Sequence, residues 1–219
     1  MVPTIAPELV EFEGGFKDTP EWGSSFIICP WYIYQWYGDN RLIAEYYPDM
    51  QRYIEYLSSQ AKDHIVAYGL GDWFDIGPNA PGVSQLTSNG VTATAIYYYD
   101  VCLMQKMADL LGKKADVEKY KNLAAAIKTA FNKTFWNPET KQYDRNSQAA
   151  NAVALYMGLT TPENHQQVYE NLVKDIRSRN NALTAGDVGY RYVLRALEAG
   201  GASDIIYDMN SKYDTPGYG

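Results

Sequence analysis

Two short stretches of the sequence place carboxylates directly beside a tryptophan. The first holds Asp18, Glu21 and Trp22, and the second holds Asp72 and Trp73. An indole ring can cover the C–H face of a sugar, while carboxylates accept hydrogen bonds from its hydroxyl groups. Glycoside hydrolysis also requires two carboxyl groups, one to protonate the leaving oxygen and one to act on the water or the anomeric carbon. The two stretches therefore indicate a saccharide site.

Each of these residues also has a structural interpretation. Asp18 precedes Thr19 and Pro20, so it could cap the start of a helix as readily as bind a ligand. Trp22 and Trp73 could be core residues, which is the usual position of a tryptophan. Their neighbouring glycines and carboxylates favour the binding role instead.

Two further aspartates are weaker candidates. Asp75 can hold the turn before Gly77 and Pro78. Asp187 lies where a predicted helix begins, and an acidic N-cap is the commonest role of such a residue. We keep Asp187 as a candidate substrate-binding residue beside this capping interpretation.

The remaining reactive side chains show no site. His64 and His165 lie in polar stretches, and a lone histidine is usually an ordinary surface residue. Cys29 and Cys102 lie in apolar stretches without metal-ligand spacing, so we expect buried, reduced thiols. Since no GxGxxG, Walker A, GxSxG or HExxH motif occurs, nucleotide, acyl-transfer and zinc-hydrolase chemistry have no support. We expect neither a metal nor an organic cofactor.

Charge and hydropathy narrow the class of partner. The 219 residues carry a formal net charge of −7, which would repel nucleic acid over most of the surface. No apolar run reaches about 18 residues, and the N-terminus lacks a basic stretch followed by an apolar block, so no membrane or targeting segment is predicted. The 20 tyrosines suit both helix packing and contact with sugar rings. A neutral ligand fits best, and the compartment stays open, with a periplasmic or secreted parent protein compatible with the sequence.

Apolar residues recur at helical spacing along most of the chain, in two kinds of segment. Segments that are apolar on one side only are typical of outer helices, whereas segments that are apolar nearly all round must be covered on every side. The outer type comprises 40–60, 117–135, 163–179 and the beginning of one more helix at 203–209. The inner type comprises 24–37, 92–111, 148–159 and 187–200. This alternation predicts an all-α fold of helical hairpins, as in an α/α toroid.

The connections locate the site within that fold. Short links join inner helices to outer ones, and long loops at 64–90, 136–147 and 180–187 return to the next inner helix. Because every return lies at the same end of the hairpins, the long loops share one face, and loops longer than about 12–15 residues are usually functional. An α-solenoid is less favoured, since the hairpins share no signature at a fixed period of about 34 or 40 residues.

An ordered set of motifs resembles the bacterial α-L-rhamnosidases of glycoside hydrolase family 78. The matching motifs are Asp-Thr-Pro-Glu-Trp-Gly at 18–23, Pro-Trp-Tyr-Ile-Tyr at 30–34, Tyr-Gly-Asp at 37–39, Gly-Asp-Trp at 71–73 and Thr-Ala-Gly-Asp-Val-Gly-Tyr at 184–190. The similarity extends over essentially the whole chain. It implies a six-hairpin (α/α) barrel that hydrolyses terminal α-L-rhamnosides with inversion, without an organic cofactor.

The resemblance also implies roles for single residues. Tryptophans at the positions of Trp22 and Trp73 form walls of the rhamnose pocket in this family. Its two catalytic glutamates match positions before Met1 and after Gly219, so we expect no catalytic residue within this chain. With four inner helices instead of six, residues 1–219 are expected to form an incomplete (α/α)6 six-hairpin toroid, a partial catalytic domain.

An incomplete barrel has three expected consequences, and two other functions stay open beside it. The chain should bind a rhamnose-containing saccharide, fail to hydrolyse it alone, and self-associate through the apolar edges of the truncated barrel. One alternative is a non-catalytic carbohydrate-binding or assembly module. Another is a six-hairpin glycosidase for a different sugar, such as an arabinoside or a uronide.

Overall fold

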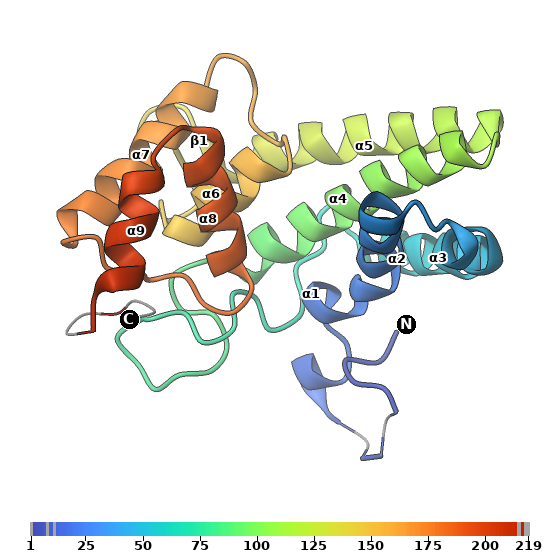
Figure 1. The fold of residues 1–219 in the computed structure, drawn as a ribbon, viewed down its shortest axis with the longest axis horizontal. Helices are drawn as coiled ribbons and strands as arrows, with labels where there is room; N and C mark the ends of the chain where they lie inside the picture. Colours follow the sequence, from blue (N-terminus) through green and yellow to red (C-terminus); the bar gives the residue numbers. More distant parts are fainter. Residues whose placement is uncertain (1, 8, 11, 214–215, 217–219) are drawn as a thin grey trace.

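The computed structural model describes residues 2–7, 9–10, 12–213 and 216. Its main elements are eight helices paired in sequence as four hairpins (Figure 1). The hairpins are α2 (Ser25–Tyr37) with α3 (Arg41–Gln60), α4 (Asn89–Leu110) with α5 (Lys114–Phe135), α6 (Gln148–Tyr156) with α7 (His165–Ser178), and α8 (Gly189–Ala199) with α9 (Ser203–Ser211). The short elements are the 3-10 helix η1 (Gly14–Phe16), α1 (Pro20–Gly23), and the strands β1 (Trp136–Asn137) and β2 (Gln142–Tyr143). The all-α prediction is confirmed, and the two-residue strand pair lies within one of the long loops.

The odd and even helices occupy different positions. Helices α2, α4, α6 and α8 form a row in which each contacts the next, and each also packs against the helix that follows it in the chain. In Figure 1 the α4–α5 hairpin is the longest, with α2 and α3 beside one part of it and α6 to α9 gathered at its other end. This is the predicted alternation of inner and outer helices.

The two central inner helices are buried on nearly all sides, as predicted. Helix α4 supplies Val91 and Ala95 to a cluster with α6 to α9, and Ala93 and Tyr97 to a cluster with α2, α3 and α5. Four of the nine residues of helix α6 are buried alanines, whose small side chains permit close approach of its neighbours. The core is therefore continuous through α4, and both halves of the chain are fixed to that helix.

The prediction fails for the two end helices of the row. In α2 only Ile27 and Pro30 are buried, and Trp36 is 76% exposed. In α8 one side carries the exposed residues Arg191 and Arg195, so this helix is amphipathic instead of apolar all round. Among the described residues, α2 packs closely against one inner neighbour, α4, and α8 against one, α6. Between α2 and α8 themselves, the Arg191 guanidinium contacts the hydroxyl and the ring of Tyr32.

The same geometry corrects the prediction for one cysteine. Cys29 is exposed on α2, because this end helix is covered by an inner neighbour on one flank only. Cys102 on α4 is half-buried, and both thiols are free. Among the described residues, no helix combines the length and hydropathy needed to cross a membrane.

Local sequence signals explain where the helices begin and end. Gly38 follows α2 with a positive φ of 68°, and its amide donates to the carbonyl of Tyr34, which closes the last turn. Ser147 precedes α6, and its hydroxyl oxygen accepts from the amide of Ala150 at 3.1 Å, the usual N-cap bond. The short links and the long returns thus end where the sequence predicts.

Candidate functional site

The predicted site residues gather at the end of the row where α4, α6 and α8 begin. Helix α1 carries Glu21 and Trp22, the 61–88 loop between α3 and α4 carries Asp72 and Trp73, and the loop between α7 and α8 carries Asp187. These segments are distant in sequence and are joined by the polar contacts described below. The predicted loop face is therefore a real feature of the fold.

Glu21 connects three elements through its carboxylate. Its Oε2 accepts from the Thr19 hydroxyl at 2.5 Å, and its Oε1 accepts from the Thr92 hydroxyl of α4 at 2.6 Å. Burial raises the pKa of Glu21 to about 7, although both hydroxyl bonds lower it, and the nearby charge of Asp72 raises it further. This carboxyl group changes its charge near neutral pH.

Asp72 connects the 61–88 loop to α8. Its Oδ1 accepts from the amide of Gly189 at 2.6 Å, and its Oδ2 accepts from the amide of Gly186 at 2.9 Å. The residue is fully buried, and burial raises the pKa of Asp72 to about 6 against the lowering effect of both amides. A direct contact between Asp72 and a ligand stays a prediction, and it would require this buried group to become accessible.

Trp73 is neither core nor free surface. It is half-buried and makes edge contacts with Phe16 and Phe74, with ring centroids 5.0 Å apart in both pairs. Phe74 has a positive φ of 63°, a strained conformation for a bulky residue, and its amide donates to the carbonyl of Gly82 at 2.9 Å. Sequence reasoning missed Phe16 and Phe74, although Phe74 directly follows one of the selected stretches and Phe16 lies two residues before the other.

Trp22 is also half-buried, on α1. The preceding residues do not cap this helix through their side chains in the described structure. Asp18 instead accepts a hydrogen bond from the hydroxyl of Tyr56 on α3, and the Thr19 hydroxyl bonds to Glu21. Asp18 thus supports α1 from outside, and its predicted contact with a ligand stays a prediction.

Asp187 does not cap α8. The carboxylate at this helix end belongs to Asp72, and the N-cap position is Val188. The Asp187 amide donates to the carbonyl of Trp73 at 2.8 Å, while its side chain is exposed. Of the predicted acidic residues, Asp187 is therefore the most accessible to a ligand.

The Asp75 carboxylate does not hold the turn before Gly77 and Pro78, where only the Asp75 carbonyl takes part by accepting from the Gly77 amide at 3.0 Å. Its carboxylate accepts from the amides of Gln85 and Leu86 at 2.9 and 2.7 Å and from the Ser84 hydroxyl at 3.0 Å. These bonds fold the 61–88 loop back on itself. Asp75 has a structural role.

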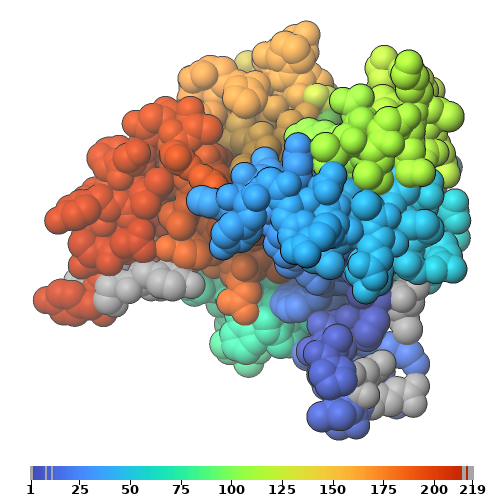
Figure 2. Space-filling view, turned by 45° about the vertical axis from the view of Figure 1, so that its right-hand side comes forward, coloured from blue at the N-terminus to red at the C-terminus, as the bar shows by residue number. Residues whose placement is uncertain are grey.

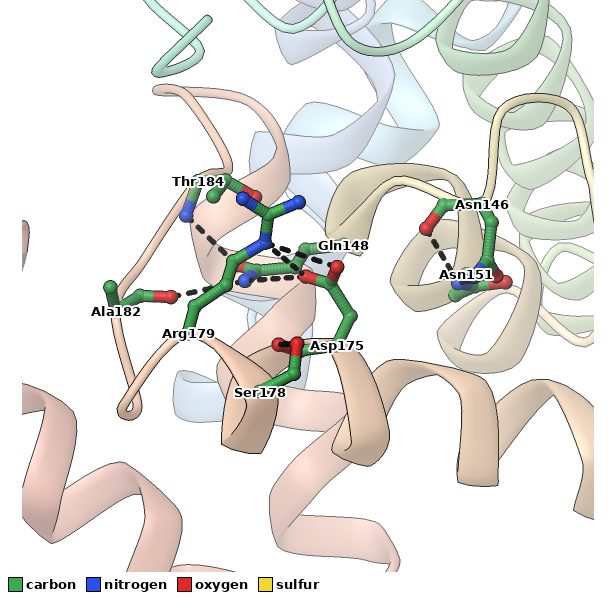
Figure 3. A network of polar contacts seen from close by, with 8 residues as sticks. All are labelled: Asn146, Gln148, Asn151, Asp175, Ser178, Arg179, Ala182 and Thr184. Carbon is green, nitrogen blue, oxygen red and sulfur yellow. Dashed lines mark hydrogen bonds and ion pairs between the residues drawn. The ribbon is translucent and has the colours of Figure 1, made fainter.

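A polar network inside the fold holds the loop before α8 from its other side (Figure 3). Gln148 of α6 is fully buried, and its side chain accepts from the Thr184 amide at 2.9 Å and donates to the Ala182 carbonyl at 3.0 Å. Gln148 also donates to Asp175, which pairs with Arg179 at 3.1 Å. Sequence reasoning missed Gln148, although a lone polar residue at the start of an apolar inner helix is a usable signal.

Asp100 is a second polar residue within an apolar inner helix that sequence reasoning missed. It is fully buried on α4, and its Oδ2 accepts from the Ser24 hydroxyl at 2.5 Å. Its Oδ1 has no hydrogen-bond partner among the described residues, and burial raises the pKa of Asp100 well above its usual range. A neutral carboxyl group fits this position best.

Nothing within the described residues resembles a metal centre. No group of three or more histidine, cysteine, aspartate or glutamate side chains is suitably placed there. His64 is exposed, and His165 bonds through Nδ1 to the Thr160 hydroxyl at 2.9 Å. Neither histidine lies among the predicted site residues.

Comparison with known proteins extends over the whole chain. The family model described as the bacterial alpha-L-rhamnosidase 6 hairpin glycosidase domain matches residues 1–219. An alpha-L-rhamnosidase of Formosa agariphila is 30% identical over 207 residues, which are 90% of this chain and 21% of that protein. The structure of an alpha-L-rhamnosidase from Dictyoglumus thermophilum superposes with a TM-score of 0.87 at 33% identity, over 93% of this chain and 23% of the other.

A further solved relative was crystallised with a sugar. The Streptomyces avermitilis alpha-L-rhamnosidase complexed with L-rhamnose superposes with a TM-score of 0.80 at 27% identity, over 90% of this chain and 18% of the other. The chain thus spans about a fifth of the length of the relatives that it matches.

Proposed function

The chain belongs to the family of bacterial α-L-rhamnosidase six-hairpin glycosidase domains, and we propose that its loop face binds the terminal L-rhamnose unit of a saccharide. The observation that supports this proposal is the backbone hydrogen bond from Asp187, whose side chain is exposed, to the half-buried Trp73 at the start of α8. Trp22 is half-buried on α1, and its neighbour Glu21 bonds to Thr92 at the start of α4. The structure of a relative in complex with L-rhamnose supports the choice of sugar.

The proposed binding mode assigns different work to different residues. Trp22 and Trp73 are half-buried, and their indole rings are proposed to cover the apolar face of a sugar. The exposed Asp187 carboxylate can accept hydrogen bonds from sugar hydroxyls. The Glu21 carboxylate already accepts hydrogen bonds from the hydroxyls of Thr19 and Thr92, and it thereby holds α1, which carries Trp22. Only its remaining lone pairs can accept from the ligand.

We further propose that catalysis needs groups outside these residues. An inverting glycosidase places an acid and a base about 6.5–9.5 Å apart, on opposite sides of the anomeric carbon. In this chain the two site carboxyls with a raised pKa, Glu21 and Asp72, are both held by hydrogen bonds within the fold. Hydrolysis of terminal α-L-rhamnosides with inversion is thus proposed for a complete domain, and binding alone for this chain.

A calorimetric titration with L-rhamnose tests the binding proposal. Trp22→Ala and Trp73→Ala should each weaken binding about tenfold or more, because each removes a stacking surface. Trp36→Ala is the matched control, since Trp36 is exposed at the opposite end of α2. If L-rhamnose does not bind the unmodified chain, or if Trp36→Ala weakens binding as much as the other two variants, the proposed site is wrong.

Activity separates this proposal from a complete enzyme within the chain. Each missing proton-transfer group lowers a rate by about 10²–10⁴-fold, so p-nitrophenyl α-L-rhamnoside should not be hydrolysed measurably. Turnover that Glu21→Gln or Asp187→Asn abolishes would place the acid or the base inside these residues. Tighter binding of an arabinoside or a uronide than of L-rhamnose would favour a six-hairpin glycosidase for another sugar.

Self-association is part of the proposal, because the end helices leave apolar surface in solvent. A hollow of about 690 Å³ lies between α2 and α8, lined by residues that include Tyr32, Trp36, Tyr156 and Arg195. Figure 2 shows the two ends of the row meeting here, with the blue α2 segment beside the orange and red C-terminal helices. We propose that a second copy covers this edge when the chain is alone in solution.

A further inference from the structure

We infer that Asp72 is a positioning residue, whose buried carboxylate fixes the start of α8 so that Trp73 and Asp187 face the same site. This inference rests on the proposed function for the meaning of that site. It differs from the sequence prediction, in which Asp72 itself contacts the sugar. Asp72 has no exposed surface, and each of its oxygens already accepts a backbone amide.

The contacts of Asp72 bridge the chain over long sequence distances. The acceptor lies 114 residues from Gly186 and 117 residues from Gly189. Two backbone hydrogen bonds continue the same junction on either side. The Asp187 amide donates to the Trp73 carbonyl at 2.8 Å, and the Ile76 amide donates to the Thr184 carbonyl at 2.9 Å. The tryptophan and the exposed carboxylate are thus tied together by their own backbones.

Helix α8 explains why a carboxylate is suitable at this position. The first amides of a helix lack partners within the helix, and the helix dipole favours a negative charge there. The N-cap residue Val188 has no side-chain acceptor, and Gly189 is the first residue of the helix. Asp72 supplies the missing acceptor from another segment, and it satisfies two amides with one charged group.

The glycines of the junction are a second, independent sign of a built contact. A Cβ atom on Gly186 would lie 2.1 Å from the Trp73 carbonyl oxygen and 2.6 Å from the Asp75 nitrogen. A Cβ atom on Gly189 would lie 2.6 Å from the Ala149 Cβ. No side chain fits at either position without displacement of backbone or core, so the two loops approach as closely as peptide groups allow.

The double-mutant cycle of Asp72→Asn and Asp187→Ala tests whether Asp72 acts through Asp187. An asparagine keeps one acceptor oxygen but turns a donor toward an amide, so one of the two bonds is lost. Asp72→Asn should weaken L-rhamnose binding about tenfold, and Asp187→Ala should have little additional effect in that background. If the fold-losses of L-rhamnose affinity from the two single substitutions multiply in the double variant, the inference is overturned. Asp187 would then contribute to binding whether or not Asp72 holds the start of α8.

Hydrogen exchange of single amides makes the test independent of the ligand. The Gly186 and Gly189 amides should be protected in the unmodified chain and should exchange at least about tenfold faster in Asp72→Asn. Asp116→Asn is the control, since Asp116 accepts from Tyr47 and Gln51 of another helix, away from the site. Unchanged protection of both glycines in Asp72→Asn would overturn the inference. If L-rhamnose does not bind but the exchange result holds, the proposed function fails and the role of Asp72 in placing α8 stands.

Discussion

Glu21 should make the stability of the protein depend on pH, and Glu21→Gln should remove that dependence. The pKa of Glu21 is raised from an ordinary value of 4.5 to about 7, chiefly by burial. Between these values the unfolded chain loses the proton while the folded chain keeps it. The contribution of Glu21 to the free energy of unfolding is therefore complete below pH 4.5 and is lost as the pH rises through about 7.

The structure sets the size of this effect and explains why glutamine is suitable. A difference of about 2.5 pKa units corresponds to roughly 3 kcal/mol, since one unit is about 1.4 kcal/mol. In Glu21→Gln the new amide oxygen would accept from Thr19 as the carboxylate does, and the amide nitrogen would donate to the Thr92 hydroxyl. That hydroxyl can then donate to the Asn89 carbonyl, which lies 3.2 Å away. The substitution thus changes the charge with little loss of hydrogen bonding.

Urea unfolding from pH 4.5 to pH 8 measures the prediction directly. From pH 4.5 to pH 8 the unmodified chain should lose about 3 kcal/mol of unfolding free energy relative to Glu21→Gln. Asp72 contributes a pH dependence of the same sign, because its pKa is also raised, and burial, the largest cause of that rise, is common to both proteins. Glu118→Gln, an exposed residue on α5, is the control and should show no shift. A difference for Glu21→Gln that stays constant within about 1 kcal/mol would refute the reasoning.

Three further substitutions test the buried carboxylate, the junction and the open edge. Asp100→Asn keeps the Ser24 bond and should gain stability relative to the unmodified chain as the pH rises from 5 to 9, since burial raises the pKa of Asp100; thermal unfolding at both pH values checks this. Gly189→Ala should cost about 1–3 kcal/mol in urea unfolding, and the addition of Ala149→Gly should recover part of the loss. Sedimentation should show a dimer of the unmodified chain at micromolar concentration and a shift to monomer for Trp36→Ser, whereas a monomer in both cases would exclude the proposed edge contact.

Hydrophobic periodicity was sufficient to predict the order and approximate bounds of the hairpins. The central helices α4 and α6 are covered on all sides, as their sequences require. The end helices are different, because burial there depends on neighbours that periodicity does not supply. The sequence of α8 contains an indication of this difference, because Arg191 and Arg195 lie four residues apart and therefore give the helix one charged side.

The end of the fold at which the candidate residues lie was predictable, and their contacts were less so. Long loops and tryptophans beside carboxylates indicated the end where α4, α6 and α8 begin, and there the Asp187 amide bonds to the Trp73 carbonyl. The carboxylate that caps α8 could not be predicted. Asp72 accepts a hydrogen bond from the Gly189 amide, which lies 117 residues further along the sequence. Capping rules consider only nearby residues, and they selected Asp187 instead.

A raised pKa of a carboxyl group often indicates a catalytic residue, but in this fold it accompanies carboxyl groups that join two segments of the chain. Carboxyl groups tuned toward neutrality are common in active sites, because an acid or a base must exchange protons at working pH. Here Glu21, Asp72 and Asp100 each accept a hydrogen bond from another segment, and none of the three is exposed. Burial between joined segments raises the pKa of each group, so the pKa follows from the structural role. Among the candidate site carboxylates, Asp187 has the exposed side chain, and its backbone amide bonds to the Trp73 carbonyl. In these residues a raised pKa therefore accompanies a carboxyl group held between segments, and exposure is what separates Asp187 from Glu21, Asp72 and Asp100.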